Sequence, residues 1–193
     1  MCIKFSAIKN LIVLLSAIIC LFVCNSMAFA IDFTQVTEDA KITKALQALE
    51  RVHSFDVLNK VMYNNTSKRP VKIMFYSLAT LSPKYAEAHA LATSLDDGTL
   101  YILIDSRHKK AAPEEIACLI AHEITHQLTV TTMEEEVQAW TNEVQQWIKF
   151  KTENPNLRTS GELTNRLERM VALYNNSAIA YNVHTNRHYA GLK

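Results

Sequence analysis

Cysteine is scarce in this sequence, and its distribution excludes a disulfide framework. Three of the four cysteines lie within the first 30 residues, and Cys118 is the only one in the rest of the chain. No disulfide can therefore form within residues 31–193. Because Cys118 lies in an apolar segment, we expect it to act as a small buried hydrophobic residue rather than as a metal ligand or a redox switch.

A surplus of basic residues is also lacking, which argues against strongly anionic partners. The formal net charge is +1, and it becomes −1 without the first 30 residues, which contain two lysines and no acid. Such a balance would attract neither nucleic acid nor an anionic surface. The sequence shows no internal repeat and no low-complexity segment. Its 49% hydrophobic and 20% charged residues suit one globular domain, which we place at residues 31–193.

The first 30 residues have the pattern of an export signal. A weakly basic start precedes an apolar run over residues 11–24, and Ala28-Phe29-Ala30 then supplies the small-x-small pattern of a signal-peptidase site. We predict cleavage after Ala30 and a secreted or periplasmic protein. The alternative is that residues 11–30 are retained as a membrane anchor. N-terminal sequencing of the exported protein distinguishes the two.

The segment His122-Glu123-Ile124-Thr125-His126 predicts a metal site. Two histidines at i,i+4 leave one face of a helix, so that both imidazoles can reach one zinc ion. The carboxylate of Glu123 between them can act as a general base toward a water molecule. The apolar residues around the motif indicate a buried helix, in which an unpartnered imidazole pair would be costly.

A catalytic zinc ion needs a third protein ligand, and the sequence narrows the choice. No aspartate follows His126, so the candidates downstream are glutamates or one of His184 and His188. The earlier histidines at 53, 89 and 108 show no ligand spacing and are assigned surface or core roles.

Among the glutamates, Glu136 is the best placed. It belongs to a helix that we predict to begin at Met133, with a threonine cap, and it lies roughly 70° from the centre of that helix's apolar stripe. By the same measure Glu135 points away from the core, and Glu134 and Glu143 lie at the margin. We therefore favour Glu136 as the third ligand, with Glu143 as a supporting or alternative residue.

The remaining pattern predicts an α+β fold. Apolar residues at helical spacing indicate helices over residues 37–54 and 55–63, another beginning near Pro113, and a later one over 163–174. A strand over 71–76 and a hairpin of 89–95 with 99–105 indicate a small, mostly antiparallel sheet of about three strands. If the outer edge of the strand over 100–104 is free, an extended peptide could pair with it.

The motif, the strand before it and the sequence Glu136-Val137-Gln138-Ala139-Trp140 resemble the zinc peptidases called gluzincins. In these enzymes HExxH on one helix is completed by the glutamate of a Glu-x-x-Ala pattern on a following helix. The resemblance covers residues 99–150 and implies a zincin-like fold, one zinc ion and hydrolysis of peptide bonds. Glu136 follows His126 after only ten positions, as in small, little-characterised bacterial metallopeptidases.

These features predict an exported zinc metallopeptidase with Glu123 as the general base. Donors that could stabilise a developing oxyanion lie in the C-terminal segment, namely Tyr181, His184, His188 and Tyr189. Two alternatives remain: a catalytically silent metal-binding scaffold or interaction domain, and a processing protease anchored in the membrane. The expected partner is a protein or peptide substrate, and a membrane only if the N-terminal segment stays attached.

Overall fold

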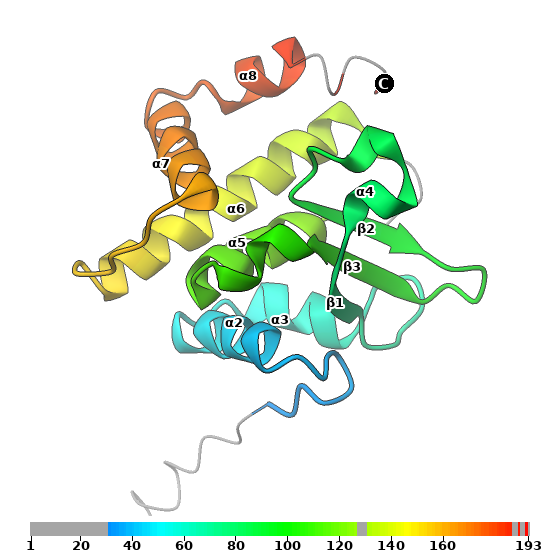
Figure 1. The fold of residues 1–193 in the computed structure, drawn as a ribbon. Coiled ribbons are helices and arrows are strands. Elements are labelled where there is room, and N and C mark those ends of the chain that lie inside the picture. The colour runs from blue at the N-terminus through cyan, green and yellow to red at the C-terminus, as the bar shows by residue number, and fades with distance from the viewer. Residues whose placement is uncertain (1–30, 127–130, 187–188, 190–191, 193) are drawn as a thin grey trace, which may run out of the picture. The chain divides into compact units, whose positions relative to one another are not determined.

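A computed structural model describes residues 31–126, 131–186, 189 and 192 (Figure 1). Contacts divide the chain into two units, residues 1–32 and residues 33–193, and all of the helices and strands below belong to the second unit. The predicted export signal and His188 lie outside the described residues. Within the described part, no helix has both the length and the apolar character needed to cross a bilayer.

Two helices open the second unit, as the sequence predicts. Helix α2 (Ala40–Arg51) begins after Asp39, whose carboxylate accepts a 2.8 Å hydrogen bond from the Lys41 N–H and so caps the helix. Helix α3 (Phe55–Met62) follows after a short turn. Their apolar faces are fully buried, with Leu46 and Leu58 among the largest core side chains.

The sheet has three strands in the order β1-β3-β2, formed by β1 (Lys72–Tyr76), β2 (Ala90–Ser94) and β3 (Leu100–Asp105). The predicted hairpin is confirmed: β2 and β3 are antiparallel, and Gly98 takes the positive φ of 77° that their connecting turn requires.

The sheet is mixed rather than mostly antiparallel, because β1 pairs with β3 in parallel. The segment between β1 and β2, which holds α4 (Leu78–Leu81) and the 3-10 turn η1 (Pro83–Tyr85), carries the chain to the far edge before the hairpin returns it to the middle. Strand β3 is therefore paired on both sides. Residues 100–104 therefore have no free edge, and the outer strands of the sheet are β1 and β2.

After β3 the chain passes through the 3-10 turn η2 (Ser106–Lys110) into α5 (Pro113–Glu123), the most deeply buried helix. Figure 1 shows α5 between α2 and α6 (Met133–Glu153), and both neighbours pack against it. Helix α6 starts where it was predicted to start, with the Thr132 hydroxyl accepting a hydrogen bond from the Glu135 N–H at 3.2 Å.

Two further helices pack against α6, and the first of them also contacts α5. Helix α7 (Glu162–Asn175) confirms the helix expected there, and it follows Gly161, whose φ is 111°. Helix α8 (Ile179–Thr185) was not predicted. A small apolar cluster joins α6, α7 and α8, and consists of Val144, Met170, Ile179 and Val183.

Candidate metal centre

The two histidines of the motif lie at and just beyond the C-terminal end of α5, and their rings are arranged edge to face with 5.3 Å between centroids. The helix ends at Glu123, one turn earlier than expected, so His126 lies in a tighter turn beyond it. In that turn the N–H of His126 donates to the carbonyl of Glu123 at 3.1 Å, three residues back. Both imidazoles are buried, with 7% of each residue exposed.

Glu136, on the first turns of α6, faces both rings. Its Oε2 lies 3.8 Å from Nε2 of His122, and its Oε1 lies 3.5 Å from Nε2 of His126. These contacts are longer than ordinary hydrogen bonds. Ligand atoms from the three residues nevertheless all lie within 4.8 Å of one another, which makes the group one of those that could hold a metal ion.

The spacing and the unmet polar atoms fit a zinc ion at this point. Two ligands of a tetrahedral zinc ion lie about 3.4 Å apart, since each is about 2.0–2.1 Å from the metal. Buried Oε2 of Glu136 has no hydrogen-bond partner among the described residues, which leaves a carboxylate oxygen available toward the two rings. The set of two imidazoles and one carboxylate is also one that catalytic zinc sites use.

Glu143, two turns further along α6, holds His122. Its Oε2 accepts a 2.9 Å hydrogen bond from Nδ1 of His122, which leaves Nε2 directed at Glu136. Burial alone would disfavour a charged ring, but the hydrogen bond and charge of Glu143 outweigh it and raise the pKa of His122. The sequence analysis assigned Glu143 a supporting or alternative role, and the geometry fits the supporting one.

Glu143 is fully buried and its charge is balanced by Arg166 of α7. The guanidinium donates two hydrogen bonds to the carboxylate, one of them at 2.8 Å to Oε2. Although burial opposes ionisation, the charge of Arg166 and the hydrogen bond from His122 lower the pKa of Glu143 to about 2. Sequence reasoning missed Arg166. The one indication in the sequence is that this positively charged residue lies between Leu163 and Leu167, which belong to the buried apolar stripe.

Glu135 contradicts the prediction that it points away from the core. Its side chain is only 17% exposed, and its Oε1 lies 3.4 Å from Nδ1 of His126. Each imidazole therefore has Nε2 toward Glu136 and Nδ1 toward a second carboxylate, but of the two Nδ1 atoms only that of His122 makes a hydrogen bond with a residue that the structure describes. Burial, together with the charge of His122, lowers the pKa of His126 to about 3, which keeps this ring neutral as a metal ligand must be.

Glu123 lies beside the histidines and is anchored by the sheet. Its Oε2 accepts a 2.8 Å hydrogen bond from the backbone N–H of Ala92, in β2. Burial raises the pKa of this carboxyl, an effect that the charge of His122 and the Ala92 hydrogen bond reduce. A buried carboxylate with a raised pKa is suited to accept a proton near neutral pH. Sequence reasoning did not foresee the contact with Ala92.

The motif opens onto a cleft of about 1470 Å³. One wall is formed by β2 and the segment 83–89 before it. The lining also includes Trp140, Arg166 and Tyr189. Cys118 lies on α5 with no exposed surface, and burial raises the pKa of its thiol well above the usual range, which agrees with a packing role.

Of the four predicted donors, the structure brings one to this cleft. The Tyr189 hydroxyl accepts a 3.0 Å hydrogen bond from Nε1 of Trp140, and burial followed by the charge of Glu136 raises its pKa to about 12. Tyr181 is 75% exposed on α8. His184 is also exposed, with Nδ1 3.0 Å from the Ala180 carbonyl. Neither of these two lines the cleft, and His188 is not described.

Replacing Glu136 by glutamine is expected to weaken zinc binding by at least tenfold, because the neutral amide is a much poorer zinc ligand than the carboxylate. Glu134→Gln is the matched control: this acid is exposed on the same helix turn and its loss leaves the cluster intact. Competition with a chromophoric chelator measures both affinities. Equal zinc affinity in the two variants would remove Glu136 from the ligand set.

Comparison with known proteins adds no family assignment to this geometry: no family model matches the chain, and no curated protein or solved structure gives a significant match.

Proposed function

We propose that the protein is an exported zinc-dependent peptidase of the gluzincin type, with a zincin-like fold, in which His122, His126 and Glu136 hold one zinc ion. The observation that carries the proposal is the convergence of these three side chains on one point, beside the anchored carboxylate of Glu123. Zinc bound there would supply Lewis acidity toward a peptide carbonyl and an attacking water molecule. Export follows from the N-terminal pattern of the sequence.

Glu123 serves as the general base and then as the acid. Its Oε2 is held by the Ala92 N–H, so Oε1 is the oxygen that accepts the proton of the attacking water. The same carboxyl then donates that proton to the leaving amine. Burial favours this order of steps, because it raises the pKa of Glu123 and so makes the protonated carboxyl accessible between the two proton transfers.

An extended peptide is the substrate that the cleft suits best. Strand β2 is an edge strand of the sheet and lines the cleft along its whole length. The N–H of Ala92 points away from β3 and donates to Glu123, so the outer edge of β2 faces the reacting groups, with this one amide already engaged. A substrate strand that pairs with this edge would pass its scissile bond beside the metal ligands.

Tyr189 provides a hydroxyl near the third ligand. Its raised pKa keeps the phenol protonated, and the hydroxyl can donate to Glu136 or to an oxyanion in the cleft. We expect Tyr189→Phe to reduce kcat by about 10²-fold if the hydroxyl stabilises the oxyanion. A change confined to zinc affinity would instead assign Tyr189 to holding Glu136. Steady-state kinetics at saturating zinc separates the two effects.

The decisive experiment measures zinc content and peptide cleavage together. The purified protein is stripped with a chelator, reconstituted with zinc and incubated with a diverse peptide library, whose products are identified by mass spectrometry. We expect cleavage only in the reconstituted sample, and none in a His122→Ala variant. A protein that binds zinc in this group without cleaving any peptide would favour the silent scaffold over the peptidase.

A further inference from the structure

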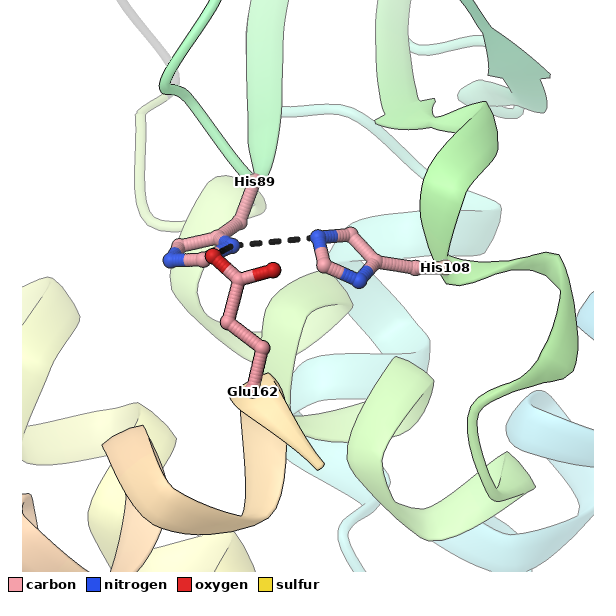
Figure 2. Close-up of side chains that lie close together, drawn as sticks. All are labelled: His89, His108 and Glu162. Atoms are coloured by element: carbon pink, nitrogen blue, oxygen red, sulfur yellow. Dashed lines mark hydrogen bonds and ion pairs between the residues drawn. The ribbon is translucent and has the colours of Figure 1, made fainter. Parts of the chain in front are cut away.

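A second group of potential ligands lies on three separate elements (Figure 2). His89 immediately precedes β2, His108 lies in η2 after β3, and Glu162 is the first residue of α7. The two histidines are 19 positions apart in the sequence, which gives no ligand spacing, and they were therefore assigned surface or core roles. The fold brings their rings together, a proximity that their spacing in the sequence does not indicate.

The donor atoms of this group are close and partly shielded. Nδ1 of His89 lies 3.0 Å from Nε2 of His108, and 3.8 Å from Oε1 of Glu162. Figure 2 shows the carboxylate turned toward the two rings. His108 is buried, the His89 side chain is 21% exposed, and that of Glu162 is 60% exposed. The group is thus anchored in the interior and open to solvent at one corner.

We propose that His89, His108 and Glu162 form a second site for a divalent cation of the zinc class, separate from the centre at His122. Two imidazole nitrogens and one carboxylate oxygen form a ligand set that zinc accepts, and a water molecule can complete the coordination at the exposed corner. The separations of 3.0 and 3.8 Å bracket the distance of about 3.4 Å expected between two ligands of one tetrahedral ion.

The surroundings of both rings favour the neutral form, which is the form that binds a metal ion. Burial, followed by the charges of Arg166, His108 and Arg107, lowers the pKa of His89 to about 3. Burial and the charge of Arg107 also lower the pKa of His108. Protons therefore compete little with a cation for these two nitrogens.

A cation bound between these ligands would lie close to the positive charge of Arg107. Its guanidinium donates three hydrogen bonds of 2.8–3.0 Å to the carbonyls of residues 86–88, and its Nε donates to Nε2 of His108 at 3.3 Å. A cation would replace this last bond, the 3.5 Å contact between Nη2 and Nδ1 of His89, and the hydrogen bond between the two rings. The arginine can stay anchored on the carbonyls. The charge of Arg107 lowers the affinity of the site for a cation. It also attracts the carboxylate of Glu162, whose Oε2 lies 3.7 Å from Nε.

An ion at this site would connect the sheet to α7. His89 and His108 come from the ends of paired strands, whereas Glu162 begins the helix that carries Arg166. Because Arg166 balances Glu143, which holds His122, the start of α7 is structurally linked to the first centre. The second ion is therefore a clamp that fixes α7 against the cleft wall formed by β2.

Zinc titration of a chain that lacks the first centre tests the proposal. In a His122→Ala/His126→Ala variant, dialysis followed by elemental analysis is expected to find one zinc per chain, and added zinc is expected to raise the thermal unfolding midpoint. A variant that is folded by circular dichroism but retains no zinc would overturn the second site. This outcome does not depend on whether the intact protein cleaves peptides, so the two proposals fail separately.

Ligand substitutions complete the test in the otherwise unchanged chain. Glu162→Gln changes a largely exposed side chain and should fold normally, and His89→Asn provides an independent second variant. Each is expected to lower the zinc content from two ions per chain to one, or to weaken the second binding event at least tenfold. His53→Asn is the control, since His53 is exposed and its φ of 54° suits asparagine. Unchanged second-site binding in both ligand variants would contradict the proposal.

Discussion

Replacement of Glu123 by glutamine is expected to slow peptide hydrolysis by about 10²–10⁴-fold, the range that a positioned general base contributes. Glutamine keeps the shape of the side chain and can still accept the hydrogen bond from the Ala92 N–H, so the cleft should be preserved. It cannot accept a proton from water. Because Glu123 is not among the proposed ligands, zinc content should stay the same.

Glu114→Gln is the matched control for this substitution. Glu114 lies on the same helix, but its carboxylate pairs with Arg51, at 3.0 Å. Its loss should change the rate by less than about twofold, since partly exposed ion pairs contribute little. Initial rates on one fluorogenic peptide, at matched zinc content, compare the two variants. Wild-type turnover in Glu123→Gln would exclude Glu123 as the base and with it the proposed mechanism.

Replacement of Arg166 by methionine is expected to destabilise the protein by about 3–5 kcal/mol, the cost of leaving a buried charge without its partner. Glu143 has no exposed surface, and Arg166 supplies the charge that balances it. Methionine fills similar volume, so packing is changed little. Urea unfolding monitored by circular dichroism measures the loss. Arg169→Met, at an exposed position on α7, should change the free energy of unfolding by less than about 0.5 kcal/mol.

The loss of stability in Arg166→Met should become smaller as the pH falls. The pKa of Glu143 is about 2 in the folded protein, below its usual value of 4.5. Its ionised, paired form therefore stabilises the fold above about pH 4.5, and this contribution disappears as the pH falls toward 2. In Arg166→Met the buried carboxyl can take up a proton instead. The difference in the free energy of unfolding between the wild type and Arg166→Met should thus decrease from pH 7 to pH 4. A difference that stays constant would contradict the assigned role of the pair of Arg166 and Glu143.

The features that the sequence predicted are those set by local spacing. The cap at Thr132 and the position of Glu136 on α6 follow from the geometry of a single helix, and the structure has both. The hairpin turn at Gly98 is a local signal of the same kind. Each depends on residues within a few positions of one another, so no knowledge of distant packing was needed.

What the sequence could not predict depends on which elements become neighbours. The apolar stripe of α6 was assumed to mark its buried side, yet the face against α5 is lined by Glu136, Ala139 and Glu143. Because that face is stabilised by ion pairs as well as by apolar contacts, hydrophobic periodicity alone placed its centre too far round the helix. For the same reason Glu135 was predicted to point away from the core, whereas it lies beside His126.

Long-range pairings account for the other differences. Arg166 meets Glu143 from a different helix, and His89 meets His108 only because β2 and β3 are paired. The parallel pairing of β1 with β3 likewise depends on the path between β1 and β2, which no residue pattern specifies. Such contacts become predictable only once the order of the strands is known.

If the protein is the proposed peptidase, the bond between Ala92 and Glu123 has a consequence for how its substrate preference could change. The donor is a main-chain amide, so almost any amino acid at position 92 leaves the carboxylate tethered, and proline alone would remove it. Side chains along the strand are therefore free to diversify what the groove accepts without disturbing the reacting groups. The side chains of β2 would determine selectivity, whereas a main-chain amide of the same strand positions the proposed general base.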